Sequence, residues 1–215
     1  MIIAIDGPAG SGKGTLARRL AAHYHSFHLD SGKLYRLTAI RAENKHVDLN
    51  LPKQVEAIFA DLNLSDLDNP ALSTHLAGTL AAKYSPHPVV RKYVNEFVRR
   101  IARENPLGIV ADGRDIGTIV LPNADVKLFV IADVEVRARR RLREIHGVGQ
   151  SGTYDEVLAD LIKRDNADTK RKVAPLKAAA DAHILDNSHL DIEGGVRAAI
   201  AIVEAVRAKD IRHNK

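Results

Sequence analysis

The sequence contains no cysteine and no tryptophan, and aromatic residues make up only 4% of its 215 residues. Without cysteine, the chain has no disulfide, cysteine-ligated zinc, iron–sulfur cluster or thiol nucleophile. The low aromatic content argues against a protein that stacks many nucleic-acid bases on its side chains. No stretch approaches about 18 consecutive apolar residues, and the first residues do not resemble a signal peptide. We therefore expect no membrane span and a cytoplasmic location.

The composition that is present is typical of a globular protein. Hydrophobic residues make up 45% of the chain and charged residues 27%, which is enough apolar surface to bury a core. Lysine and arginine number 32 against 27 aspartates and glutamates, giving a net charge of +5. This excess favours a polyanionic partner, and it does not separate nucleic acid from small phosphorylated ligands.

Short apolar runs alternate with helical patterns along the chain. Residues 2–5 form a β-branched run that ends at Asp6, which is typical of a buried parallel strand entering a turn. From Gly14 onward, apolar residues recur at helical spacing. Further strands are expected at residues 26–30, 109–111, 126–131 and 182–185, and a last helix at 192–206. The alternation predicts an α/β fold with a parallel sheet.

Two segments fit the sheet pattern poorly. Residues 37 to about 98 are largely helical in pattern, and residues 137 to about 177 are dense in charge around a glycine-rich turn at 147–152. We expect both to be insertions over the sheet, a position where mobile lids commonly lie.

A glycine-rich loop lies between the first expected strand and the first expected helix. It matches G-x-x-x-x-G-K followed by Gly-Thr, and its residues are Gly7, Pro8, Ala9, Gly10, Ser11, Gly12, Lys13, Gly14 and Thr15. Glycines let successive N–H groups converge on phosphate oxygens, and the helix N-terminus adds positive charge. Lys13 supplies a cation to the β- and γ-phosphates, and Thr15 a hydroxyl to a phosphate or a metal ion. The loop predicts nucleoside triphosphate binding.

GTP switches, motors and small-molecule kinases share such a loop. The Asn-Lys-x-Asp guanine motif is missing, because residues 44–48 contain one residue too many, and the chain is short for a motor. These observations favour a kinase, which needs a second anion site for its acceptor.

Candidate acceptor residues follow the second expected strand. Arg36 could clamp an acceptor phosphate, and Tyr35 could pack against a base, because loops at strand ends line the ligand crevice of such sheets. The alternative is an ordinary helix N-cap at Asp30 or Ser31, with Arg36 in solvent.

Two charged clusters follow later in the chain. Asp112 ends the third strand and is typical of a residue that organises Mg²⁺, directly or through water, while Arg114 adds a cation; the alternative is a tight turn with a surface ion pair. Arg164, Asp168 and Arg171 fall on one helix face, and such arginines neutralise a transferring phosphoryl group.

Other charged or titratable residues have plainer interpretations. Arg137 and Arg139 are more typical of a solvated charged helix than of a phosphate site. His23, His25 and His28 straddle a helix-to-strand turn, which favours surface positions over a metal site.

These clusters, in this order, resemble the bacterial cytidylate kinases, members of the nucleoside-monophosphate kinase group of P-loop kinases. The likeness covers nearly the whole chain. Its most specific carriers are the Asp-Gly-Arg-Asp-x-Gly-Thr stretch at 112–118 and the Arg-Asp…Ala-Pro-Leu stretch at 164–176.

The resemblance implies a three-layer P-loop fold with a five-stranded parallel sheet. It divides the chain into core residues 1–36, 99–136 and 178–215, a CMP-binding insertion at 37–98 and a lid with its following helix at 137–177. It implies that Lys13, Arg114, Arg164 and Arg171 are catalytic, and that residues 7–15 bind ATP. The residues it implies for CMP are Ser31, Gly32, Tyr35, Arg36, Arg91, Asp112, Gly113, Arg114, Asp115, Arg164, Asp168 and Arg171.

Within that set, Arg91 and Asp115 would read cytosine. Two positions depart from the family pattern: Ala82 replaces a serine that helps to read the base, and Ser73 replaces an arginine. The loss of such a hydrogen-bonding partner could relax base selectivity.

The expected activity is therefore transfer of the γ-phosphoryl group of ATP to CMP or dCMP by a monomer, with Mg²⁺ bound to the phosphates and water and to Asp112 or Thr15. We expect no stable nucleic-acid partner and no membrane partner. The alternatives are a kinase of the same group acting on UMP, AMP or a non-nucleotide alcohol, and a non-catalytic, ATP-dependent RNA-binding protein.

Overall fold

The computed structural model describes residues 1–147, 149 and 151–213; Val148 and Gln150 of the expected glycine-rich turn lie outside the described residues. The chain divides into two compact units. Unit 1 comprises Met1–His28 and Asn105–Lys215, and unit 2 comprises Leu29–Glu104. The expected insertion at 37–98 falls within unit 2. Among the described residues, no helix combines the length and apolarity that a membrane span needs.

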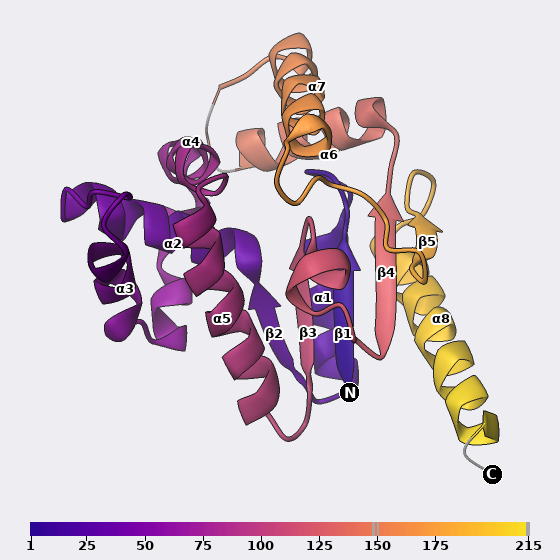
Figure 1. The fold of residues 1–215 in the computed structure, drawn as a ribbon. Coiled ribbons are helices and arrows are strands. Elements are labelled where there is room, and N and C mark those ends of the chain that lie inside the picture. The colour runs from indigo at the N-terminus through magenta and orange to yellow at the C-terminus, as the bar shows by residue number, and fades with distance from the viewer. Residues whose placement is uncertain (148, 150, 214–215) are drawn as a thin grey trace. The chain divides into compact units, whose positions relative to one another are not determined.

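A five-stranded sheet runs through the fold in the order β2-β3-β1-β4-β5 (Figure 1). Its strands are β1 (Ile2–Asp6), β2 (Phe27–Asp30), β3 (Ile109–Gly113), β4 (Val126–Ile131) and β5 (His183–Asp186). Strand β1 pairs in parallel with β3 and with β4, and β4 pairs in parallel with β5. The expected α/β fold with a parallel sheet is confirmed, and the predicted strands lie within a residue or two of the observed ones.

The strand sequences explain why β1 lies at the centre of the sheet. Its residues from Ile3 to Asp6 are all buried, as expected of a β-branched run covered on both faces. Helices α1 (Lys13–His23) and α8 (Ile192–His213) pack on the same core, which includes Leu16, Leu20 and Val203. The carboxyl end of β1 therefore delivers the glycine-rich loop directly to the start of α1.

The remaining helices of unit 1 form a hairpin, α6 (Val134–Gly147) and α7 (Tyr154–Lys170), and a short π-helical turn, η3 (Ile116–Val120). The two long helices pack through a small apolar cluster that contains Ala138, Val157 and Leu161. Helix α7 begins with a capping box in which Thr153 and Glu156 each bond to the other's backbone N–H. This hairpin occupies most of the segment expected to form a lid.

Unit 2 is helical, as its pattern predicted. It contains α2 (Ser31–Asn44), α3 (Pro52–Ala60), α4 (His75–Tyr84) and α5 (Pro88–Glu104), with two short 3₁₀ turns, η1 (Leu64–Asp68) and η2 (Pro70–Ser73). A buried cluster of Ala39, Ala42, Ile58 and Tyr84 holds α2, α3 and α4 together.

Candidate active site

The glycine-rich loop occupies the turn between β1 and α1, and two of its glycines are required by geometry. A Cβ on Gly7 would lie 2.1 Å from the carbonyl oxygen of Val130, so no side chain fits there. Gly12 caps α1 with a positive φ of 91°, a conformation that favours glycine. Lys13 folds back over the loop and donates from Nζ to the carbonyl of Pro8, 3.2 Å away. A glycine-rich backbone, a lysine and a helix N-terminus suit phosphate binding, and we call this arrangement the phosphate cradle.

Two side chains from distant segments hold the backbone of this loop. Asn187, just after β5, donates from Nδ2 to the carbonyl of Ser11 at 2.8 Å. Arg137 of α6 donates from Nη1 to the carbonyl of Ala9 at 3.1 Å. Sequence reasoning missed Asn187, although its position at the carboxyl end of the last strand is where loops of such sheets line the ligand crevice.

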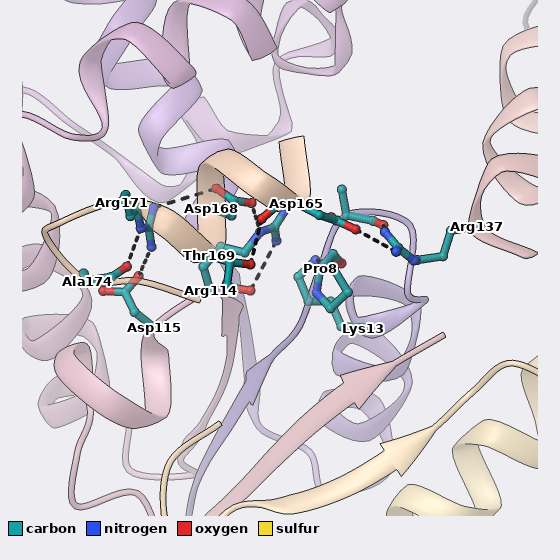
Figure 2. A network of polar contacts seen from close by, with 12 residues as sticks. Pro8, Lys13, Arg114, Asp115, Arg137, Asp165, Asp168, Thr169, Arg171 and Ala174 are labelled. Carbon is teal, nitrogen blue, oxygen red and sulfur yellow. Dashed lines mark hydrogen bonds and ion pairs between the residues drawn. The ribbon is translucent and has the colours of Figure 1, made fainter. Parts of the chain in front are cut away.

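The position of Arg137 differs from the one expected from the sequence. The charge pattern favoured a solvated position, but the residue is only 5% exposed. Its Nη2 donates to Asp165 at 2.7 Å (Figure 2). Its Nε donates to the carbonyl of Ala132 at 2.8 Å. Arg139, by contrast, is exposed as expected. A charge run along α6 does not show which of its members turns toward the phosphate loop.

A cleft of about 490 Å³ opens beside the phosphate loop within unit 1. The described residues that line it are Gly10, Gly12, Thr15, Leu16, Arg140, Arg143, Glu144, Asn187, Leu190, Asp191 and Ile192. Arg140 is anchored there by donating from Nη2 to the carbonyls of Asn187 and Leu190. Burial lowers the pKa of Arg140, and the neighbouring charge of Arg143 lowers it further. A guanidinium facing apolar side chains next to a phosphate cradle suits a purine and its ribose.

Asp112 is 4% exposed and lies close to the start of α1. Its Oδ2 would be 3.7 Å from a Cβ built on Gly14, and its Oδ1 bonds to His28 Nε2 at 2.9 Å. The expectation of a surface position for His28 is therefore wrong. Asp112 and the hydroxyl of Thr15 in the first turn of α1 are oxygen donors of the kind that Mg²⁺ prefers, so the residues fit that ion. No group of three or more metal-ligating side chains gathers anywhere in the described part of the chain.

A network of ion pairs joins the loop after β3 to the end of α7 (Figure 2). Arg114 donates from Nε to Asp168 Oδ2 at 2.7 Å, and Arg171 Nη2 lies 3.4 Å from Asp115 Oδ1. Arg171 Nη1 also lies 3.9 Å from the second oxygen of Asp168. The alternative of a surface ion pair after the third strand is wrong, because Asp115 is buried.

Arg164 and Arg171, expected on one face of the helix, have different surroundings. Arg171 is the residue after the helix, with an extended backbone, and its Nε donates to the carbonyl of Ala174. It therefore turns back toward Asp168 rather than continuing the helix face. Arg164, nearly two turns before the helix end, is exposed.

A carboxylate that sequence reasoning did not assign, Asp6, ends β1 next to Gly7. Burial raises its pKa to about 6, against the opposing effect of two backbone N–H groups, those of Gly117 and Ile116. The charge of Asp115 also raises this pKa, and that of Lys13 lowers it. A polar residue that ends an apolar strand beside a phosphate loop is the signal that could have identified it.

The expected acceptor residues outside unit 1 lie on two helices of unit 2. Asp30 caps α2 by accepting from the N–H of Lys33, and Ser31 and Gly32 are the first two residues of that helix. The N-cap interpretation is thus correct for Asp30, but Arg36 is not in solvent. It is half-buried and donates from Nη1 to the carbonyl of Leu72 at 3.0 Å.

Arg91 of α5 is 5% exposed, and its guanidinium carbon lies 5.7 Å from the centre of the Tyr35 ring. Its Nη1 also donates to the carbonyl of Ser85. The two residues that depart from the family pattern, Ala82 on α4 and Ser73 in η2, are both exposed.

Known proteins resemble this chain over nearly its full length. The cytidylate kinase family matches residues 3–205. Two similar curated proteins are the cytidylate kinase of Nitrobacter winogradskyi, 53% identical over 212 residues, and that of Afipia carboxidovorans, 52% identical over 208 residues. These alignments cover 99% and 97% of this chain and 100% and 99% of the relatives.

A solved structure of an uncharacterized protein from Eubacterium ventriosum is 17% identical, covers 95% of this chain and 98% of its own, and has a TM-score of 0.55, which supports the fold alone. The family match and the two relatives go further, because they follow the chain from the phosphate loop to the last helix at high identity. The chain belongs to the cytidylate kinase family.

Proposed function

We propose that the protein transfers the γ-phosphoryl group of ATP to CMP and to dCMP, giving ADP and the corresponding diphosphate. The observation that carries the proposal is the near full-length match to curated proteins named cytidylate kinase, at 52–53% identity. The site supports it, because a phosphate cradle and paired arginines and carboxylates lie on the same unit.

On the donor side, the backbone of residues 7–15 holds the ATP phosphates, and Lys13 neutralises them. The cleft beside the loop takes the adenosine, with Arg140 against the base. Mg²⁺ bound with ATP would be held by Asp112 or Thr15, directly or through water, and it would supply positive charge to the donor phosphates.

On the acceptor side, the proposal keeps the residues that the resemblance implies for CMP. Arg114, Arg164 and Arg171 neutralise the transferring group, and Asp168 orients the first and last of these. Ser31, Gly32, Tyr35 and Arg36 would hold the nucleotide, together with Asp112 and Gly113. Arg91 and Asp115 would read the cytosine.

The chemistry requires little from the protein beyond charge and position. A phosphate monoester is already a competent nucleophile, so no dedicated general base is needed. Closure of the α6–α7 segment would exclude water, which otherwise competes as the acceptor. In this proposal residues 37–98 form the CMP-binding insertion, and residues 137–177 form the lid.

The proposal also includes a cytoplasmic monomer. Residues of one chain line the donor cleft beside the phosphate cradle, which supports a monomer. ATP and CMP are cytoplasmic metabolites, which supports that location.

The test is ADP release from Mg-ATP with CMP, dCMP, UMP, AMP and dTMP as acceptors, in the wild type and in Arg91→Ala. Arg103→Ala, an exposed change on the same helix, is the matched control. We expect turnover of CMP and dCMP far above the rest, lost in Arg91→Ala and kept in the control. Comparable turnover of UMP or AMP would show a changed base site. No turnover, with salt-dependent RNA binding instead, would favour the non-catalytic alternative.

A further inference from the structure

Asp6 is a buried carboxylate that the phosphoryl transfer described above does not use. It is the last residue of β1, directly before Gly7, and it is 4% exposed. Burying an ionisable group is costly unless its hydrogen bonds are satisfied. The hydrogen-bond partners of Asp6 therefore indicate its structural role.

Those partners belong to a different loop. Oδ1 of Asp6 accepts from the N–H of Ile116, and Oδ2 accepts from the N–H of Gly117, both at 2.8 Å. These two amides open η3, and they directly follow Arg114 and Asp115. Each carboxylate oxygen thus binds one of two consecutive N–H groups, which fixes both the position and the rotation of that backbone.

A second side chain supports the same point. A Cβ on Gly117 would lie 3.2 Å from Cδ of Lys127, so the lysine stem lies against the bare glycine. The ammonium group of Lys127 is held in turn by both oxygens of Asp181, at 2.9 and 2.7 Å. The loop is therefore attached by Asp6 and packed against β4.

We propose that Asp6 is a positioning residue that fixes the loop carrying Arg114 and Asp115 relative to the phosphate loop. This inference rests on the proposed function, because its kinetic consequence concerns the acceptor nucleotide. One residue then connects the two loops: its backbone continues into the ATP phosphate loop, and its side chain holds the loop that carries the acceptor-side arginine. In-line transfer depends on such positioning.

The proposal differs from the simpler idea that Asp6 only supports the phosphate loop. If it acted on that loop, its loss would raise the KM for ATP. If it acts on the loop after β3, its loss raises the KM for CMP and lowers kcat, with the KM for ATP little changed.

The experiment compares the wild type with Asp6→Asn. The change preserves the size of the side chain but replaces one acceptor oxygen with an amide NH₂ group, which cannot accept from the backbone N–H that it faces. We expect the KM for CMP to rise about tenfold or more, the effect of a lost hydrogen bond to a charged group, with the KM for ATP within about twofold. Amide hydrogen exchange at Ile116 and Gly117 should accelerate at least about tenfold, and this readout does not depend on activity.

The matched control is Asp125→Asn. Oδ2 of Asp125 accepts from the N–H of Ile2 at 2.6 Å, so it binds the opposite end of β1 away from the site. This variant should leave both KM values unchanged.

A second variant covers the case in which Asp6→Asn does not fold. Gly117→Ala keeps Asp6 but pushes the loop away from Lys127, and it should raise the KM for CMP alone. Equal rises in both KM values, or unchanged exchange at the two amides, would overturn the inference. A wild type that never phosphorylates CMP would instead refute the proposed function, while the exchange measurement would still decide whether Asp6 holds the loop.

Discussion

Removal of the Arg137 guanidinium is expected to destabilise the protein more than any single change at its exposed neighbours on α6. Arg137→Met keeps the length and the apolar stem but removes the charge. The change deletes hydrogen bonds to Asp165 and to the carbonyls of Ala9 and Ala132. A methionine side chain cannot donate a hydrogen bond to any of these acceptors. Each acceptor therefore loses an interaction at a poorly solvated position.

The magnitude follows from the burial of the pair. Breaking a buried ion pair by removing one partner costs about 3–5 kcal/mol. The side chain of Arg137 is 6% exposed, but that of Asp165 is 24% exposed, so water recovers part of the cost. We therefore expect the free energy of unfolding to fall by about 3 kcal/mol. For a chain of this length, that lowers the melting temperature by about 6–12 °C.

Urea unfolding followed by circular dichroism measures this loss, with Arg139→Met as the control. Arg139 is exposed, and its guanidinium lies 5.9 Å from the ring of Tyr154, an interaction that contributes about 0.5–1 kcal/mol. A double-mutant cycle with Asp165→Asn isolates the pair, and its coupling energy should be about 1–3 kcal/mol. The reasoning is refuted if Arg137→Met and Arg139→Met differ by less than about 1 kcal/mol, or if the cycle shows no coupling.

Three further outcomes are expected. Burial raises the pKa of Asp6 from 3.8 to about 6, so the wild type should gain stability as the pH falls through 6. The gain over Asp6→Asn between pH 7 and pH 4 should be about 2 kcal/mol, measured by urea unfolding at both pH values; a constant difference contradicts this. Gly7→Ala places a Cβ 2.1 Å from the carbonyl of Val130, so calorimetry should detect no ATP binding. Asn187→Ala frees the carbonyl of Ser11 and should raise the KM for ATP about three- to tenfold, with the KM for CMP unchanged.

The parts of the site that could be predicted from the sequence are those that a local rule governs. The phosphate loop is one such part, because its strand, its glycines at fixed spacing and its helix N-terminus all lie within residues 2–23. The strand ends are another, since Asp112 follows an apolar run whose length and composition set its position. Both expectations needed no knowledge of distant residues.

The residues that were missed or misjudged act on the backbone of segments far away in the chain. Arg137 and Asn187 each hold a carbonyl of the phosphate loop from more than a hundred residues away, with sequence separations of 128 and 176. Asp6 binds amides 110 and 111 residues further on. A backbone carbonyl has no sequence signature, so the partner of a polar side chain stays hidden until the chain is folded.

The pairing of Arg114 and Arg171 with Asp168 and Asp115 explains how cations can be held ready for phosphates. Two guanidinium groups brought together without anions would repel each other, and their partial burial would add a desolvation cost. Each arginine here contacts a carboxylate, and Asp168 contacts both, so protein groups orient the two side chains. A group that is already oriented requires little reorganisation when charge develops on the transferring phosphoryl group. In the proposed function, the same ion pairs that fasten the end of α7 to the loop after β3 also prepare the electrostatics on which phosphoryl transfer depends.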